Sequence, residues 1–174
     1  MKILAISGSA RASSTNTAML RAVVEIAQPE HEITVFAGVA DLPVFSPDLE
    51  EEPLPVAVQS FFDLISENDC VIVSSPEYIR AIPGGLKNAI DWLVSRDVII
   101  DKPIALMHAS HRGDDMLAQL RLVLSTVSQR FSQDVFVRFE FMKLSPDKIS
   151  AQFTIPSNRA AVTNFLNDFV DFYS

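Results

Sequence analysis

Cysteine and basic side chains are scarce in this chain of 174 residues. The single cysteine, Cys70, cannot form an internal disulfide, and its apolar surroundings in the run CVIV contain no charge that would lower the pKa of a thiol. We therefore predict a buried structural role for Cys70. The 14 basic side chains are outnumbered by 22 acidic ones, and the net charge of −8 opposes nonspecific attraction to nucleic acid or anionic lipid. Neither is an expected partner.

Long apolar runs and metal-binding clusters are also missing. No run approaches the roughly 20 residues that span a bilayer, and the initial MKILAIS lacks the features of a signal peptide. These absences predict a cytoplasmic protein without a membrane partner. No cluster of metal ligands and no Ser/His/Asp set stands out, so we predict no metal site. The length and the 48% hydrophobic content favour a single domain over residues 1–174.

Short apolar runs alternate along the chain with segments of helical periodicity. This alternation predicts an α/β fold with a doubly wound, open, five-stranded parallel sheet and helices on both faces. The runs expected to be strands are 2–6, 32–37, 70–73, 103–109 and 134–139. The segments expected to be helices are 19–27, 58–65, 86–94, 116–127 and 162–170.

Ligands of such sheets bind beyond the carboxyl ends of the strands. The loops expected to form a site therefore follow the first, third and fourth strands, at 7–16, 74–84 and 109–115.

The first of these loops, SGSARASSTN, is rich in hydrogen-bonding groups. It precedes a predicted helix, whose N-terminus offers unpaired backbone N–H groups and a partial positive charge to an anion. Arg11 adds a planar cation suited to phosphate. The alternative is that one hydroxyl merely caps the helix while Arg11 lies in solvent. The loop matches neither G-x-G-x-x-G nor G-x-x-x-x-G-K-[ST], which favours a terminal monophosphate. Its short polar side chains are Ser9, Ser14, Thr15 and Asn16.

The second loop, SSPEYIRAIPGG, combines turn residues with an aromatic ring. Pro76 fixes a bend, and Gly84 allows close approach to a flat ligand. Tyr78 offers an aromatic surface, and backbone N–H groups near Glu77 could bond the edge of a heterocycle. The Glu77 carboxylate is alternatively a surface charge beside a helix.

The pairing of GSARASSTN with SPEY and PGGLKNAIDWLVS resembles the NADPH-dependent FMN reductase family. That family has a flavodoxin-like fold and includes chromate, quinone and azo-dye reductases. LPVFSPDLE and LAQLRLVL extend the resemblance over most of the chain. The resemblance implies the strand order 2-1-3-4-5.

The resemblance also implies a binding site for FMN, with no catalytic side chain supplied by the protein. The FMN phosphate would be held by Ser9, Arg11, Ser14, Asn16 and Thr17. The isoalloxazine would be lined by Pro76, Glu77 and Tyr78, followed by Ile79 where the family usually has asparagine. The loop after the fourth strand would approach the ring with Ser110, His111 and Gly113, of which Gly113 alone remains from the usual glycine pair.

The function implied is hydride transfer from NAD(P)H through FMN to a small acceptor such as a quinone, an azo compound, free flavin or a metal ion. Two alternatives remain open: a flavodoxin-type electron carrier, and a flavin-free relative that acts as a binding protein. A homodimer or homotetramer is implied through the helix that carries LKNAIDW. Trp92 on this helix is then either core or interface.

Charged and titratable groups in and beside the third loop allow three further expectations. His108 ends an apolar strand and is expected to be a satisfied structural histidine. His111 and Arg112 either contact the flavin or pyridine nucleotide or are solvated. Asp114 and Asp115 favour the dipole of the following helix. As free charges they would also repel NADPH more than NADH, unless Arg112 offsets them.

Overall fold

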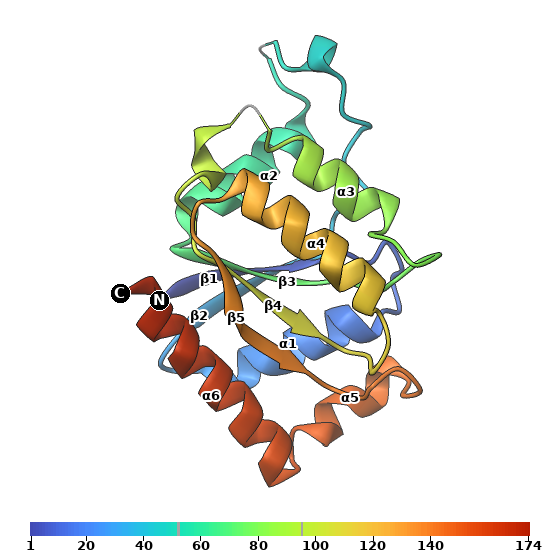
Figure 1. Ribbon diagram of the computed structural model, residues 1–174, viewed down its shortest axis with the longest axis vertical. Coiled ribbons are helices and arrows are strands. Elements are labelled where there is room, and N and C mark those ends of the chain that lie inside the picture. Colours follow the sequence, from blue (N-terminus) through green and yellow to red (C-terminus); the bar gives the residue numbers. More distant parts are fainter. Residues whose placement is uncertain (52, 95) are drawn as a thin grey trace.

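The computed structural model describes residues 1–51, 53–94 and 96–174. Within these residues a five-stranded sheet has the order β2-β1-β3-β4-β5, and every neighbouring pair is parallel (Figure 1). The predicted fold class and strand order are therefore confirmed. The strands are β1 (Lys2–Ser7), β2 (Glu32–Phe36), β3 (Cys70–Ser74), β4 (Ile104–His108) and β5 (Phe131–Arg138).

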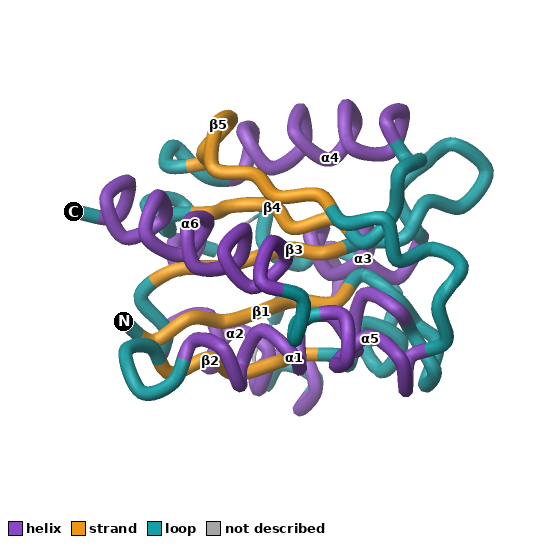
Figure 2. The backbone as a smooth tube through the Cα atoms, turned by 90° about the horizontal axis from the view of Figure 1, so that it is seen from below, coloured by secondary structure: helices purple, strands orange, loops and turns teal. Residues whose placement is uncertain are grey.

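Helices cover both faces of the sheet. Figure 1 shows α2, α3 and α4 above the strands and α1, α5 and α6 below, and Figure 2 shows the second group in front of the strands. The first group is α2 (Val56–Glu67), α3 (Gly84–Asp91) and α4 (Asp114–Val127). The second group is α1 (Thr15–Ala27), α5 (Pro146–Gln152) and α6 (Pro156–Tyr173).

Two apolar cores lie on the two faces of the sheet. Alternate residues of one strand serve opposite cores: Leu4 of β1 packs with α2 and α3, whereas Ile3 packs with α1 and α6. All five residues of β3 and of β4 are buried, including Cys70, because these central strands are covered on both sides. The predicted buried position of Cys70 is confirmed.

Three of the differences from the predicted elements have a clear local cause. The helix predicted to reach Val94 ends at Asp91, because the following backbone bonds tighten to the i→i−3 pattern, and Val94 is 70% exposed. β5 begins at Phe131, three residues before the predicted run. A register shift against β4 interrupts its pattern, and the Ser132 hydroxyl accepts a bond from the Val135 N–H there. The seven-residue helix α5 was not predicted, since Ile149 is its one buried residue.

Two 3-10 turns, η1 (Pro47–Leu49) and η2 (Asp97–Ile99), complete the regular elements. The segment that carries η1 projects beyond the helical layer of α2 and α3 (Figure 1). No helix among the described residues is long and apolar enough to cross a membrane.

Candidate functional site

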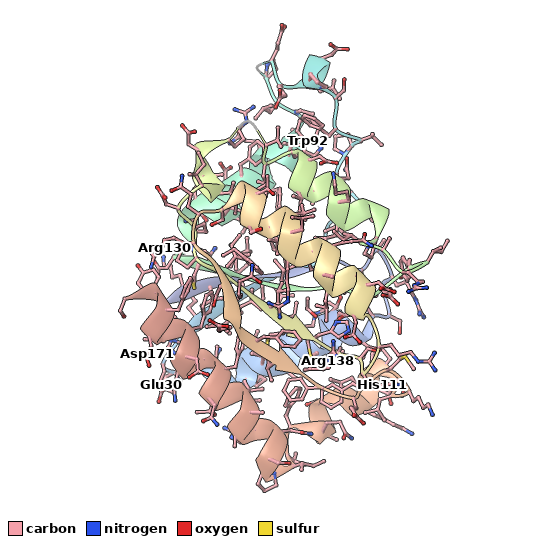
Figure 3. The ribbon with its side chains drawn as sticks, in the orientation of Figure 1. Glu30, Trp92, His111, Arg130, Arg138 and Asp171 are labelled. Carbon is pink, nitrogen blue, oxygen red and sulfur yellow. The ribbon has the colours of Figure 1, made fainter. Side chains whose placement is uncertain are left out.

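The three predicted loops meet at the carboxyl edge of the sheet, around a cavity of about 320 Å³. His111 and Arg138 mark this end of the molecule in Figure 3, and Glu30, Arg130 and Asp171 mark the opposite end. The topological rule that selected these loops therefore selected neighbours in space. The residues that line the cavity are Thr15, Asn16, Ser75, Pro76, Glu77, His108, Ala109, Ser110, Arg112 and Met142.

Buried hydroxyls fix the shape of the first loop. The Ser14 side chain caps α1 by accepting a hydrogen bond from the Thr17 N–H at 3.3 Å. The Thr17 hydroxyl is 2.8 Å from the hydroxyl of Ser7 at the end of β1. The Ser9 hydroxyl accepts a 3.3 Å bond from the Arg11 N–H. These bonds hold the backbone N–H groups of the α1 N-terminus at the sheet edge.

Asn16 ties the first loop to the neighbouring strand and also faces the cavity. Its Oδ1 accepts a 2.9 Å hydrogen bond from the buried Ser74 hydroxyl at the end of β3. Thr15 lines the cavity beside it. Arg11 is exposed on the same loop, outside the cavity lining. The cavity thus adjoins the first turn of α1, and Arg11 lies on the loop that leads into this turn.

The second loop contains a tight hairpin turn. The backbone N–H and carbonyl groups of Tyr78 and Ala81 bond each other at 3.2 and 3.1 Å. Between them Ile79 and Arg80 both have positive φ, 51° and 58°, which is the pattern of a type I′ turn. Ile79 is 99% exposed, and a β-branched residue is an outlier in this conformation. An asparagine here, as in the family pattern, therefore suits the backbone of the turn.

Helix α4 anchors this turn through three contacts. Arg80 Nε lies 2.5 Å from Asp115 Oδ2, and the Arg80 carbonyl accepts a 2.9 Å bond from Gln119. Glu77 Oε2 accepts a 3.2 Å bond from the Met116 N–H, which satisfies one of the free donors at the α4 N-terminus. The Glu77 carboxylate therefore lines the cavity and caps a helix at the same time.

The third loop folds over a buried histidine. His108 Nε2 is 2.5 Å from the Arg112 carbonyl oxygen, and burial lowers the pKa of the ring. Gly113 has φ 105°, and a Cβ on it would lie 2.8 Å from His108 Nε2, so the loop requires glycine there. The Ser110 hydroxyl accepts a 3.0 Å bond from the Arg112 N–H.

Asp114 and Asp115 are paired with arginines from neighbouring elements. Asp114 Oδ1 is 2.6 Å from an Arg138 nitrogen on β5, and Asp115 pairs with Arg80. The expectation of two free charges is therefore wrong, and the compensating cations are Arg80 and Arg138 rather than Arg112.

The structure divides the predicted site residues into two sets. Asn16, Pro76, Glu77 and Ser110 line the cavity. The other predicted residues lie on the same three loops, outside this lining: Ser9, Arg11, Ser14, Thr17, Tyr78, Ile79, His111 and Gly113.

Sequence reasoning missed Met142, which reaches the cavity from the chain after β5. The rule that points to the carboxyl ends of parallel strands also covers this fifth loop, so the topology carried the missing signal. His108 was expected to be structural, and its place in the cavity lining was not anticipated.

Trp92 belongs to the core of the single chain. Its side chain is fully buried, and its ring makes an edge-to-face contact with Phe45. Its Nε1 donates a 2.8 Å hydrogen bond to the Pro43 carbonyl. Of the two roles left open for Trp92, the structure shows the core. The ring is not available as a subunit contact.

The parallel sheet, its strand order and the cavity at its carboxyl edge define a flavodoxin-like α/β protein. The family model of NADPH-dependent FMN reductases matches residues 1–139, and the chain belongs to this family of oxidoreductases. The match extends through β5 and ends before α5.

Named relatives agree with this assignment. A quinone reductase of Escherichia coli is 37% identical over 106 residues, which are 60% of this chain and 55% of that protein. An NAD(P)H-dependent FMN reductase of Pseudomonas aeruginosa is 35% identical over 113 residues, 63% of this chain and 60% of that protein. The chain thus aligns with little more than half the length of the curated relatives it matches.

Solved structures show the same fold over the whole chain. FerB, a flavoenzyme NAD(P)H:(acceptor) oxidoreductase from Paracoccus denitrificans, has a TM-score of 0.75 at 24% identity and covers 99% of this chain and 96% of its own. An azoreductase from Bacillus anthracis has a TM-score of 0.58 at 16% identity and covers 99% of this chain and 98% of its own.

Proposed function

We propose that this protein is an FMN-dependent NAD(P)H oxidoreductase that reduces a small acceptor, with quinones as the first class to test. The observation that carries the proposal is the shared cavity of Asn16, Glu77 and Ser110, which come from the three loops expected to bind phosphate and ring. Family membership and relatives named quinone reductase support the same chemistry.

The donors around the first loop fit a phosphate monoester. The α1 N-terminus presents unpaired N–H groups and the positive end of the helix dipole. The hydroxyls of Ser14 and Thr15 and the exposed guanidinium of Arg11 add donors on the same side. None of these groups is acidic, so the set is suited to a dianion.

The part of the cavity beyond this loop fits a flat polar ring. Pro76 and Glu77 of the second loop line one side of it, and Ala109 and Ser110 of the third loop line another. Backbone N–H groups on these walls would bond the polar edge of an isoalloxazine, as in other flat-ligand sites where a few placed polar groups set orientation.

Bound FMN would supply the redox chemistry, accepting a hydride from NAD(P)H and passing electrons to the acceptor. The chain's own residues bind and orient. Asn16 and the α1 N-terminus would hold one end of the cofactor, and Glu77 bonds the Met116 N–H and so joins α4 to the turn expected beside the ring. No proton transfer by a side chain is required.

Titration of the FMN-free protein with FMN tests the phosphate loop. Replacing Arg11 with alanine should weaken FMN binding by about 1.5 to 3 kcal/mol, the range for a hydrogen bond to a charged group. Arg21→Ala is the matched control, because Arg21 is exposed on α1 away from the loop. Equal affinities of the two variants would remove Arg11 from the site.

Turnover separates the reductase from an electron carrier or a flavin-free binding protein. Purified protein with FMN should oxidise NADPH or NADH rapidly when a quinone is present. Flavin binding without NAD(P)H oxidation would favour a flavodoxin-type carrier instead. A protein that binds no flavin at all would contradict the proposed function.

We also propose a homodimer or homotetramer. Because Trp92 is buried within one chain, the surface proposed for the subunit contact is a different one. Its exposed apolar side chains are Val94 after α3, Ile100 at the end of η2 and Leu122 on α4. Burial of such apolar surface would favour self-association. Light scattering measures the mass directly, and a monomer at micromolar concentration would exclude both assemblies.

A further inference from the structure

His108 is a buried titratable group in the cavity lining that the proposed chemistry does not use. It ends β4 and is 1% exposed. Its Nε2 lies 2.5 Å from the Arg112 carbonyl oxygen, which can only accept a hydrogen bond. The neutral ring therefore carries its proton on Nε2, and the tautomer follows from this contact.

The other ring nitrogen has no corresponding contact. Nδ1 is buried and makes no hydrogen bond to any described residue. The left-handed backbone at Gly113 packs against the edge of the ring formed by Nε2 and Cε1. The imidazole is thus held on the side of the third loop, while the unprotonated Nδ1 remains without a donor.

We propose that His108 is a positioning residue for the ligand cavity: its neutral Nε2–H tautomer holds the loop 109–113 closed against the site, and protonation at Nδ1 loosens that loop. The inference rests on the proposed function, since the loop it holds supplies Ala109, Ser110 and Arg112 to the cavity. His108 acts on the ligand through this loop.

Charged groups from three directions surround the ring. Arg138 on β5 opposes a second positive charge, and Asp114 on α4 favours it, but these two residues pair with each other at 2.6 Å. Glu77 faces Gly113 from the second loop, and its carboxylate is engaged with the Met116 N–H. The side chain of Arg112 carries a further positive charge. The surroundings therefore offer the imidazolium no free counter-charge.

Backbone groups favour the protonated ring only in part. The backbones of Arg112 and Ser75 raise the pKa of His108, but desolvation outweighs them and the pKa is lowered overall. The imidazolium keeps its Nε2–H bond to Arg112, so the cost of protonation is the desolvation of its charge. That cost is relieved when the loop opens and water reaches Nδ1. Acidification should consequently reduce the fraction of protein that can bind a ligand.

Ring nitrogen NMR on the ligand-free protein tests the tautomer without any cofactor. The chain has three histidines, His31, His108 and His111, so assignment is direct. We expect the Nε2–H tautomer at His108 and a midpoint below the ordinary value of about 6.5. An Nδ1–H tautomer, or a midpoint at or above the ordinary value, would overturn the proposal.

Binding measurements then test the role in the site. Riboflavin is the main probe, because it lacks the phosphate whose own titration near pH 6 would alter FMN binding. Wild-type affinity for riboflavin should fall about threefold or more between pH 7.5 and 5.5. His108→Gln keeps a donor near the Nε2 position and cannot titrate, so its affinity for riboflavin should change little between pH 7.5 and 5.5, whatever its value at pH 7.5.

Two further variants complete the comparison. His108→Ala removes the donor to Arg112 and should weaken riboflavin at every pH. His31→Gln removes another histidine with a lowered pKa and an unpartnered Nδ1, at the far end of the sheet, and should retain the wild-type pH profile. Identical pH profiles in wild type and His108→Gln would overturn the role of His108 alone. Failure of wild type to bind either flavin would overturn the proposed function as well.

Discussion

Arg80 and Asp115 join the turn after β3 to the first turn of α4, with Nε and Oδ2 2.5 Å apart. The ion pair holds down the C-terminal side of the left-handed turn, while Glu77 holds the other side through the Met116 N–H. A contact between residues 35 positions apart thus joins the turn after β3 to the start of α4. Predictions about nucleotide choice, turn strain and loop packing follow from this arrangement.

Nucleotide selectivity should depend on the two arginines that pair with the α4 aspartates. Removing both cations, in Arg80→Gln/Arg138→Gln, leaves Asp114 and Asp115 unpaired and should raise the KM for NADPH more than the KM for NADH. The difference should fade between low salt and about 0.15 M salt, where the Debye length is about 8 Å. Steady-state kinetics with both nucleotides measures it. Equal effects on the two nucleotides would show that these charges do not face the nucleotide.

Relief of backbone strain at Ile79 should stabilise the fold. A left-handed conformation costs an ordinary residue roughly 1 to 2 kcal/mol, and asparagine tolerates it better. Ile79→Asn should therefore raise the free energy of unfolding by about 1 kcal/mol, or the midpoint of thermal unfolding by about 2 to 4 °C. Val44→Asn is the control, an 81% exposed residue without positive φ. A gain of the same size in the control would contradict the strain argument.

Gly113 should tolerate no side chain. Gly113→Ala combines a left-handed φ with a Cβ that would lie 2.8 Å from His108 Nε2, and we expect a loss of about 1 to 3 kcal/mol of unfolding free energy. Gly84→Ala is the matched control, since no atom lies within 4 Å of its new Cβ. Chemical denaturation of both variants measures the difference. Similar losses at the two glycines would refute the packing argument.

Stability should fall on mild acidification because of His108. Its folded-state pKa lies below the unfolded value, so the unfolded chain takes up the proton first. The contribution of His108 to the free energy of unfolding is fully present above about pH 6.5. It decreases below that pH, by at most about 1.4 kcal/mol per pH unit, until the pH reaches the folded-state pKa. Urea denaturation from pH 7.5 to 5 should show a smaller loss in His108→Gln than in wild type. Parallel curves would exclude this contribution.

Cys70 should be unreactive until the chain unfolds. Burial raises the pKa of its thiol to about 12, so almost no thiolate exists at pH 8 in the folded protein. A thiol reagent such as dithiobis-nitrobenzoate should release one equivalent of chromophore only in denaturant. Rapid release from the native protein would place Cys70 nearer the surface than it lies here.

The strands were predictable because each central one is a pure apolar run, and the sheet order followed from a family resemblance. The ends of elements were not predictable in the same way. The end of α3 depends on i→i−3 bonds around Trp92. The irregular first part of β5 includes a bond from the Val135 N–H to the Ser132 hydroxyl, and neither feature alters the apolar pattern.

The three loops of the site were predictable from topology alone, but their internal contacts were not. The pairing of Asp115 with Arg80 spans 35 positions, and that of Asp114 with Arg138 spans 24. No local pattern signals such contacts. The same holds for His108, whose contact with Gly113 depends on the left-handed backbone at that glycine.

Trp92 is the single tryptophan of the chain, and it is wrapped by the segment that leads into the projecting loop of η1. Its indole therefore gives the protein a built-in optical reporter: emission should be blue-shifted while Pro43 and Phe45 stay in place and should move to longer wavelength when they leave. Detachment of that one segment can be followed by fluorescence without a label, separately from circular dichroism, which follows the helices. Two transitions that do not coincide would show the projection opening before the sheet comes apart.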